Sequence, residues 1–243
     1  MGRKAIHCTQ SHVILDAVIH RYRAFSHGPA VSGRRSDDDR ALYLKQLEDL
    51  VAELGIDEPL KIVGVSFGSA LAATFAENHP DQVARQVLIS AVVDYAEDRR
   101  LFGLAKVPVL GEWLTRVFIV RRAVSRANGF IVESGANSSY AVRFDEQARF
   151  EGFEQALLSM FRSDALTSHR DTYAALVDQP KLLIWGTNDA EIPIEHLEFI
   201  RKNTSNVSFL PTEGAGHGVN LQRGEEIQRK IVEFLQDSGP LGI

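Results

Sequence analysis

The chain has 243 residues, of which 44% are hydrophobic and 24% charged, the balance of an ordinary globular protein. Its formal net charge of −5 at pH 7 provides no electrostatic case for binding nucleic acid or an anionic membrane. Cys8 is the only cysteine, which excludes an intrachain disulfide and a thiolate metal cluster. No pair of histidines stands at ligand spacing, so we expect no metal site.

The chain shows no sign of a targeting or membrane segment. The amino-terminal residues lack the apolar run of a signal peptide. The most apolar stretch, residues 101–120, contains Lys106, Pro108, Glu112 and Arg116, whereas a membrane span needs about 20 mostly apolar residues. We therefore expect a cytoplasmic protein without a membrane span. No feature of the sequence indicates an oligomeric state.

The first third of the chain alternates between helix and strand patterns. Residues 41–54 carry apolar side chains at helical spacing and predict an amphipathic helix. Residues 60–65 are a short β-branched run typical of a buried strand. Residues 67–78 predict a helix that is apolar on most faces and therefore buried, and residues 83–90 predict the next strand.

The same alternation returns after a long interruption. Strands are predicted at 181–186 and 207–210, and helices at 194–202 and 224–236. Strand and helix in alternation build a mostly parallel sheet flanked by helices. We therefore predict an α/β fold whose core is formed by residues 1–93 and 176–243. Residues 94–175 are expected to form a helical insertion that caps this core.

One short motif between the predicted strand at 60–65 and the helix at 67–78 carries chemistry. Residues 64–68 (GVSFG) match G-x-S-x-G in the strand-to-helix context of a nucleophile elbow. Such a turn strains the backbone of Ser66 and exposes its hydroxyl, and we expect side chains at Gly64 or Gly68 to collide with the neighbouring strand and helix. The backbone N–H of Phe67, at the helix start, is a candidate oxyanion donor.

A serine hydroxyl becomes nucleophilic when a base removes its proton, and that base needs an acid to hold it in one tautomer. Asp189 follows the predicted strand at 181–186, and His217 lies in a glycine-rich loop after the next strand. The ends of parallel strands gather such groups at one edge. A role for Asp189 as a helix N-cap stays open, as do Asp178 and Glu191 as rival acids.

Three segments together resemble the α/β-hydrolase superfamily: GVSFGS at 64–69, WGTNDAEIP at 185–193 and GAGHGVNL at 214–221. The resemblance covers residues 33–235. It implies a serine hydrolase with a catalytic triad of Ser66 as nucleophile, Asp189 as acid and His217 as base. It implies no cofactor.

The amino-terminal region departs from this family, which usually has two further strands and a His-Gly loop that supplies a second oxyanion N–H. The segment His27-Gly28-Pro29 does not fit, because Pro29 has no N–H to donate. A register with a helix at 13–20 and a strand at 22–25 makes Thr9 the expected second donor. The predicted fold is therefore shortened at its amino terminus.

The three motifs are not specific for a substrate. An apolar pocket in the insertion would favour a small or medium carboxylic ester, in the manner of an esterase or a monoacylglycerol lipase. Apolar residues of the insertion are expected to line a pocket for the acyl chain, or else to pack on the sheet; they are Leu110, Trp113, Phe118 and Phe130. Three alternatives stay open. They are a carbon–carbon bond hydrolase, a proline iminopeptidase, and a non-catalytic binding protein with an impaired oxyanion hole.

Overall fold

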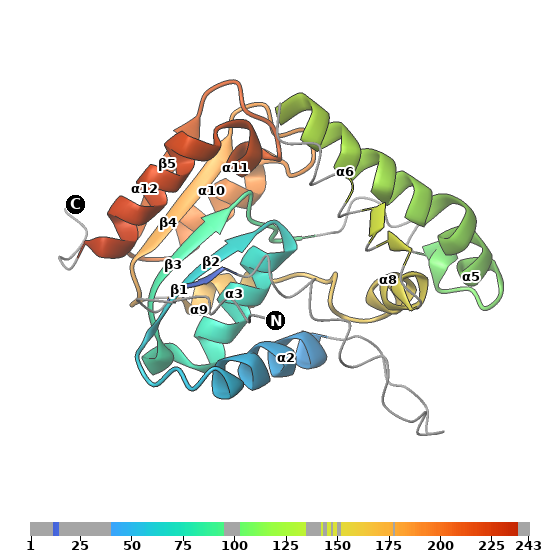
Figure 1. The fold of residues 1–243 in the computed structure, drawn as a ribbon. Helices are drawn as coiled ribbons and strands as arrows, with labels where there is room; N and C mark the ends of the chain where they lie inside the picture. The colour runs from blue at the N-terminus through green and yellow to red at the C-terminus, as the bar shows by residue number, and fades with distance from the viewer. Residues whose placement is uncertain are drawn as a thin grey trace, which may run out of the picture.

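The computed structural model describes residues 12–14, 40–94, 103–134, 142, 145–146, 148–149, 152–176 and 178–237, and these contain a five-stranded sheet (Figure 1). Its strands lie in chain order, and every neighbouring pair is parallel. They are β1 (His12–Ile14), β2 (Leu60–Val65), β3 (Val83–Ile89), β4 (Lys181–Gly186) and β5 (Val207–Thr212). The prediction of an α/β fold with a parallel sheet is confirmed.

Strand β1 corrects the register predicted for the amino-terminal region. His12 pairs with Lys61 and Ile14 with Val63, so Val13 and Ile14 belong to a strand and the helix predicted at 13–20 is wrong there. Both residues are β-branched and suit a ladder beside β2. An apolar run this short does not distinguish strand from helix by its periodicity. Residues 1–11 and 15–39, with the strand predicted at 22–25, lie outside the described residues.

Each face of the sheet has its own hydrophobic core. Alternate residues of β2 to β4, among them Ile62, Leu88 and Leu183, pack against helices on one face. Those helices are α2 (Arg40–Glu53), α3 (Phe67–Asn78), α9 (Arg170–Ala175) and α10 (Ile194–Asn203).

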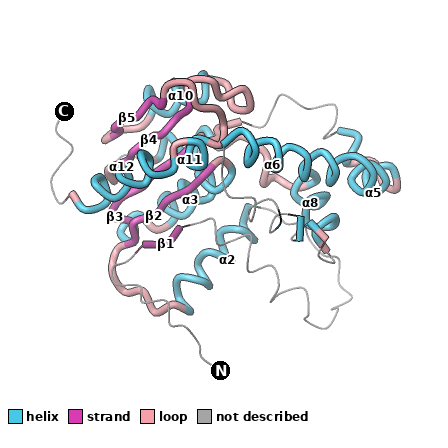
Figure 2. The backbone as a smooth tube through the Cα atoms, turned by 45° about the horizontal axis from the view of Figure 1, so that its top comes forward, coloured by secondary structure: helices cyan, strands magenta, loops and turns pink. Residues whose placement is uncertain are grey.

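The intervening residues, among them Val63 and Ile184, pack against α11 (Val219–Gln222) and α12 (Gly224–Gln236) on the other face (Figure 2). Successive side chains of a strand point to opposite faces, so a sheet covered on both sides requires the continuous apolar runs of this sequence.

The long helices of the core agree with their predicted bounds to within one residue. In α12, Ile227, Phe234 and Leu235 are buried, which is the apolar stripe expected of an amphipathic helix. Two short elements were not predicted: α11 and the 3-10 turn η3 (Pro80–Gln82). Each has fewer than five residues, too few to show a helical period.

The described part of residues 94–175 is mainly helical. It contains α5 (Leu110–Leu114), the π-helical turn η5 (Thr115–Ile119), α6 (Val120–Ser134) and α8 (Phe153–Arg162), followed by α9. Figures 1 and 2 both show α5, α6 and α8 to one side of the sheet, beyond the carboxyl ends of the strands. Helix α6 contacts α11, and α8 contacts η5. In the part of the chain that the structure describes, no helix combines the length and hydropathy needed to cross a bilayer.

Candidate active site

Ser66 stands at a sharp turn between β2 and α3. Its φ of 52° and ψ of −118° are unusual for any residue with a side chain, as predicted for this position. Hydrogen bonds to strand β2 and to the neighbouring strand β3 hold the turn. The Ser66 N–H donates to the carbonyl of Ile89 at 2.8 Å, and the buried Ser69 hydroxyl donates to the carbonyl of Gly64 at 2.8 Å.

The two glycines of the motif differ in what they accommodate. A Cβ at Gly64 would collide with the carbonyl oxygen of Gly68 and lie 2.7 Å from the Cα of Ser69, both of which are backbone atoms. A Cβ at Gly68 would meet no atom of the described residues within 4 Å. The predicted collision is therefore confirmed at Gly64 and wrong at Gly68, because only Gly64 faces the first turn of α3 at close range.

Asp189 is fixed by a turn that follows β4. The N–H of Asn188 donates to the carbonyl of Ala215 at 2.8 Å, and the N–H of Asp189 donates to the carbonyl of Gly186 at 3.0 Å. A Cβ at Gly186 would collide with the carbonyl oxygens of Ala215 and Gly216. The two loops after β4 and β5 therefore approach each other closely at this edge of the sheet.

The carboxylate of Asp189 is fully buried and makes three hydrogen bonds. Its Oδ1 accepts the backbone N–H groups of Glu191 at 2.9 Å and Ile192 at 3.0 Å. Its Oδ2 lies 3.0 Å from Nδ1 of His217. Asp189 thus caps its own turn, although it is not the N-cap of α10, which is Pro193.

The two rival acids occupy other positions. Glu191 contributes its backbone N–H to the carboxylate of Asp189. Asp178 precedes β4, so it belongs to the edge of the sheet opposite the turn of Ser66, and its carbonyl accepts a hydrogen bond from Asn206. Of the three acids, Asp189 is the one whose carboxylate is hydrogen-bonded to the imidazole of His217.

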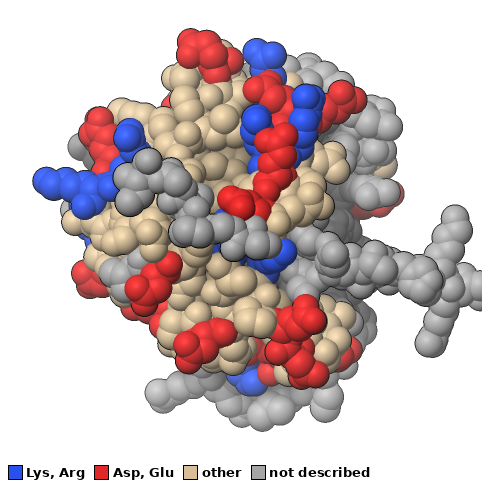
Figure 3. Space-filling model, turned by 90° about the vertical axis from the view of Figure 1, so that its left-hand side faces the viewer, with Lys and Arg blue, Asp and Glu red and all other residues tan. Residues whose placement is uncertain are grey.

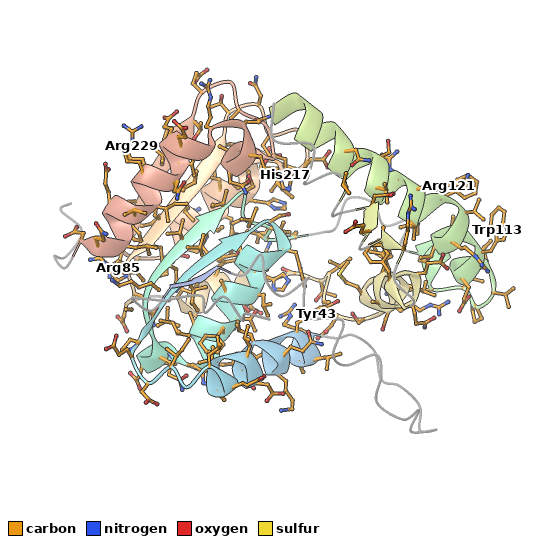
Figure 4. The ribbon with its side chains drawn as sticks, in the orientation of Figure 1. Tyr43, Arg85, Trp113, Arg121, His217 and Arg229 are labelled. Carbon is orange, nitrogen blue, oxygen red and sulfur yellow. The ribbon has the colours of Figure 1, made fainter. Side chains whose placement is uncertain are left out.

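His217 joins Asp189 to Ser66. Its Nε2 lies 3.1 Å from the Ser66 hydroxyl, and its side chain is 14% exposed. Figure 4 shows it at the edge of the sheet where the strands end. An imidazole held in this way can accept a proton from the hydroxyl. The structure thus brings together three side chains that are 151 and 28 positions apart in sequence.

Two supporting residues were not anticipated from the sequence. The Ser90 hydroxyl, directly after β3, donates to the carbonyl of His217 at 3.1 Å. The side-chain oxygen of Gln222 accepts the N–H of Gly216 at 2.6 Å. The position of Ser90 at the end of a parallel strand was a usable signal, because such ends meet at one edge. No pattern in the sequence singles out Gln222.

Of the two predicted oxyanion donors, Phe67 lies in the described part of the chain and Thr9 does not. Phe67 is the first residue of α3, where backbone N–H groups point out of the helix end. Its ring packs edge-on against Tyr43 of α2, with centroids 5.2 Å apart. Thr9 lies outside the described residues, and the register that suggested it is the one that β1 corrects.

The predicted acyl-pocket residues are not brought to Ser66. Leu110, Trp113 and Phe118 are 38%, 53% and 54% exposed. Figure 4 shows Trp113 at the outer end of the insertion, far from His217. Phe130 lies in α6, but its side chain is outside the described residues. An open hollow of about 490 Å³ beside α6 contains none of the three hydrogen-bonded residues.

Relatives of this chain include several hydrolases. An uncharacterized protein of Mycobacterium tuberculosis is 27% identical over 196 residues, which cover 75% of this chain and 57% of that protein. A 2-hydroxy-6-oxononadienedioate/2-hydroxy-6-oxononatrienedioate hydrolase of Pseudomonas putida is 24% identical over 211 residues, or 86% of this chain and 72% of the relative. A monoacylglycerol lipase of Rattus norvegicus is 20% identical over 216 residues, or 83% of this chain and 63% of the relative. The chain spans little more than half the length of the first of these.

The fold is also that of solved hydrolase structures. A thermophilic esterase from Thermogutta terrifontis superposes with a TM-score of 0.63 over 82% of this chain and 72% of that one, at 21% identity. The sequence matches the model of the Alpha/beta hydrolase family over residues 9–229, which is most of its length. This chain therefore belongs to the alpha/beta hydrolase family.

Proposed function

We propose that this protein hydrolyses a small or medium carboxylic ester through an acyl-enzyme formed on Ser66. The observation that carries the proposal is the hydrogen-bonded series at the sheet edge. The Ser66 hydroxyl lies 3.1 Å from Nε2 of His217, whose Nδ1 lies 3.0 Å from the buried Asp189 carboxylate. Three groups in this order are what an activated serine requires.

In the proposed reaction, His217 takes the hydroxyl proton while Ser66 Oγ forms a bond to the ester carbonyl carbon. Asp189 stabilises the imidazolium, and the Phe67 N–H stabilises the oxyanion. His217 then gives the proton to the leaving alcohol as the carbon–oxygen bond of the ester breaks. Water, deprotonated by His217, then attacks the acyl carbon. The bond from that carbon to Ser66 Oγ breaks, and His217 returns the proton to Oγ, which releases the carboxylic acid and restores the Ser66 hydroxyl.

Relatives support the choice of an ester. One relative is named a monoacylglycerol lipase, and the chain shares its fold with an esterase. A monoacylglycerol or an ester of similar size is the substrate class that we propose. Trp113 is not part of this proposal, because Figure 4 shows it far from His217. Leu110 and Phe118 are left out with it, because Leu110 belongs to the same helix α5 and the ring of Phe118 meets that of Trp113.

Labelling with a fluorophosphonate probe tests the proposal most directly. We expect the probe to modify the wild-type protein, peptide mapping to place the adduct on Ser66, and Ser66→Ala to abolish labelling. Ser159→Ala on α8 is a matched control that should label normally. A folded wild-type sample that fails to label would favour the alternative of a non-catalytic binding protein.

A second candidate is a carbon–carbon bond hydrolase, favoured by the relative from Pseudomonas putida. It would use the same serine, so labelling does not separate it from an esterase. A panel of p-nitrophenyl esters, a monoacylglycerol, a dienone ring-cleavage product and a prolyl-naphthylamide separates the candidates. We expect ester turnover to exceed turnover of the dienone and of the naphthylamide; the reverse order would replace the proposed substrate class.

A further inference from the structure

The outer end of the insertion carries a cluster of exposed apolar side chains. Six of the ten large hydrophobic residues that are exposed in the described part of the chain lie between positions 104 and 118. We call them the outer patch, and they are Leu104, Val107, Val109, Leu110, Trp113 and Phe118. Single exposed apolar residues are ordinary on a soluble protein, whereas a group of them in one segment marks a candidate binding surface.

The outer patch is the outward face of a segment whose inward face is packed. Ala105, Gly111, Thr115 and Ile119 are buried, and the last three follow one another every fourth residue, as on one face of a helix. Arg162 of α8 holds this inward face, since its Nε donates to the carbonyl of Ala105 at 3.0 Å. The insertion therefore already packs through its inward face, and the apolar side chains on the outward face are not needed for that packing.

Local backbone geometry brings the patch together. Leu110 and Trp113 share a face of α5 by their spacing of three, and Val109 is the residue directly before the helix. The π-helical turn η5 follows, and the rings of Trp113 and Phe118 meet edge to face with centroids 5.5 Å apart. Val109 is 81% exposed at a φ of 67°, a conformation that strains a β-branched side chain. Nothing in the fold requires an apolar residue at so exposed and strained a position.

The charge of this segment is opposite to that of the whole chain. Residues 103–134 contain five basic and two acidic residues, a net charge of +3, whereas the chain carries −5. The stretch 104–118, which holds the outer patch, contributes +1 of this charge, and α6 contributes +2. Lys106 is exposed beside Val107. The side chain of Arg116, between Trp113 and Phe118 in sequence, is 78% exposed, and its Nε lies 4.0 Å from the carboxylate of Glu154 on α8. The face shown in Figure 3, on the side of the molecule away from α5, instead carries acidic and basic side chains together.

We propose that the outer patch docks onto an anionic lipid surface. Its apolar side chains would enter the boundary between headgroups and acyl chains, where tryptophan is favoured, while Lys106 and Arg116 face lipid phosphates. A second copy of this chain is a poorer partner, because a symmetric contact would bring the same cations together. The docking does not depend on catalysis by Ser66.

Vesicle binding tests this proposal with the full chain. We expect cosedimentation with phosphatidylcholine vesicles that contain about 30% phosphatidylserine, and much weaker binding to phosphatidylcholine alone or in high salt. Tryptophan emission adds a local readout. Trp113 is 53% exposed and should shift to the blue on docking, whereas Trp185 is 3% exposed and should not change. No shift at saturating anionic vesicles would overturn the proposal.

Matched variants show whether the outer patch is the surface that binds. Trp113→Asp should weaken vesicle binding at least about tenfold, whereas Leu54→Asp, at an equally exposed apolar residue on the core, should leave it within about twofold. The double variant Lys106→Gln/Arg116→Gln should also lose at least about tenfold. Its control is Arg229→Gln/Lys230→Gln on α12, where Figure 4 shows Arg229 on the far side of the molecule.

The controls also separate a failed proposal from a failed fold. Each variant should keep the wild-type circular dichroism and, if Ser66 reacts with fluorophosphonate, the wild-type labelling. Equal loss in test and control variants would show that the outer patch is not the docking surface. Concentration-dependent dimerisation that Trp113→Asp abolishes, without vesicle binding by the wild type, would assign the patch to a protein partner instead.

Discussion

The carboxylate of Asp189 is shared between its own turn and His217. One oxygen accepts two backbone N–H groups, and the other lies 3.0 Å from the imidazole. A side chain fully buried in this way has little freedom to rotate. The same contacts that close the turn therefore aim the second oxygen at His217. The sequence presented a helix cap and a triad acid as alternatives, whereas the structure combines a turn cap with an imidazole partner.

Substitution Asp189→Asn separates these two contributions. The amide oxygen can still accept the backbone N–H groups, but the amide nitrogen cannot accept a hydrogen bond from Nδ1 of His217. We expect the rate of fluorophosphonate labelling to fall by roughly 10³ to 10⁴, with folding retained. Glu191→Gln should label at nearly the wild-type rate. The reverse pattern would make Glu191 the acid.

The glycines of the elbow give a prediction about stability. Gly64→Ala places a Cβ against the backbone of Gly68 and Ser69, which cannot move without disturbing the start of α3. We expect a loss of about 2 kcal/mol or more in the free energy of unfolding. Gly68→Ala meets open space and should change it by less than about 1 kcal/mol. Urea denaturation of both variants checks the difference, and equal effects would contradict it.

At the scale of elements, α5 depends on one arginine from α8. Arg162 donates to the carbonyl of Ala105 and, at 2.8 Å, to the carboxylate of Glu112. The hydrogen bond from Arg162 is the main reason that the pKa of Glu112 falls to about 2. Helix α5 continues through η5 into α6 in right-handed helical geometry, so these contacts hold the amino-terminal end of a longer helical segment, where the first backbone N–H groups have no partner within the helix.

Arg162→Ala should therefore loosen one element and spare the rest. We expect amide hydrogen exchange over residues 103–114 to accelerate at least about tenfold, while exchange in the strands stays unchanged. Arg149→Ala removes an exposed ion pair with Asp145 and should have no such effect. Faster exchange throughout the chain after Arg162→Ala would show that the insertion is not a separable unit.

Elements differed in how well the sequence predicted them. Helix α12 buries one face and shows its period, whereas α3 and strands β2 and β4 are buried on most sides and are continuous apolar runs in the sequence. Strand β1 has three residues, and its structure depends on hydrogen bonding to β2, which lies nearly fifty positions away. The exposure of Leu110 and Trp113 also depends on the tertiary structure. A stripe of apolar residues in a sequence does not by itself show which part of the protein packs against it.

At the scale of the whole molecule, the two ends of the insertion are tied together. The N–H of His169 donates to the carbonyl of Val93 at 2.8 Å, and Arg170 forms an ion pair with Asp94 at 2.6 Å. Burial, with the positive charge of Arg40 as a smaller cause, lowers the pKa of His169 to about 4. Burial opposes ionisation of Asp94, but hydrogen bonds from Ser168 and Arg170 lower its pKa overall.

The lowered pKa of His169 predicts that the fold weakens in mild acid. Below about pH 6.5 the unfolded chain protonates His169 while the folded chain does not, so stability falls until about pH 4 and then levels off. The loss from this group at pH 5 is roughly 2 kcal/mol. His169→Gln should lose correspondingly less stability between pH 7.5 and pH 5 in urea denaturation. Parallel pH profiles of the two proteins would contradict this assignment.

The net charge of the whole chain does not predict the charge of each part of its surface. A value of −5 gave no reason to expect contact with an anionic membrane, yet residues 103–134 carry +3 beside the outer patch. Electrostatic attraction acts over about a Debye length, so the local distribution of charge matters more than its sum over the chain.

The amino-acid sequence alone determined the parallel α/β core and the order of Ser66, Asp189 and His217 along the chain, because strand and helix periods and strand-end motifs are local signals. Only the tertiary structure decided that the Asp189 carboxylate lies against His217, that Ser90 and Gln222 brace the same loop, and that Trp113 faces outward. Each of these depends on distances between segments far apart in sequence, which are fixed by the packing of the sheet and its helices.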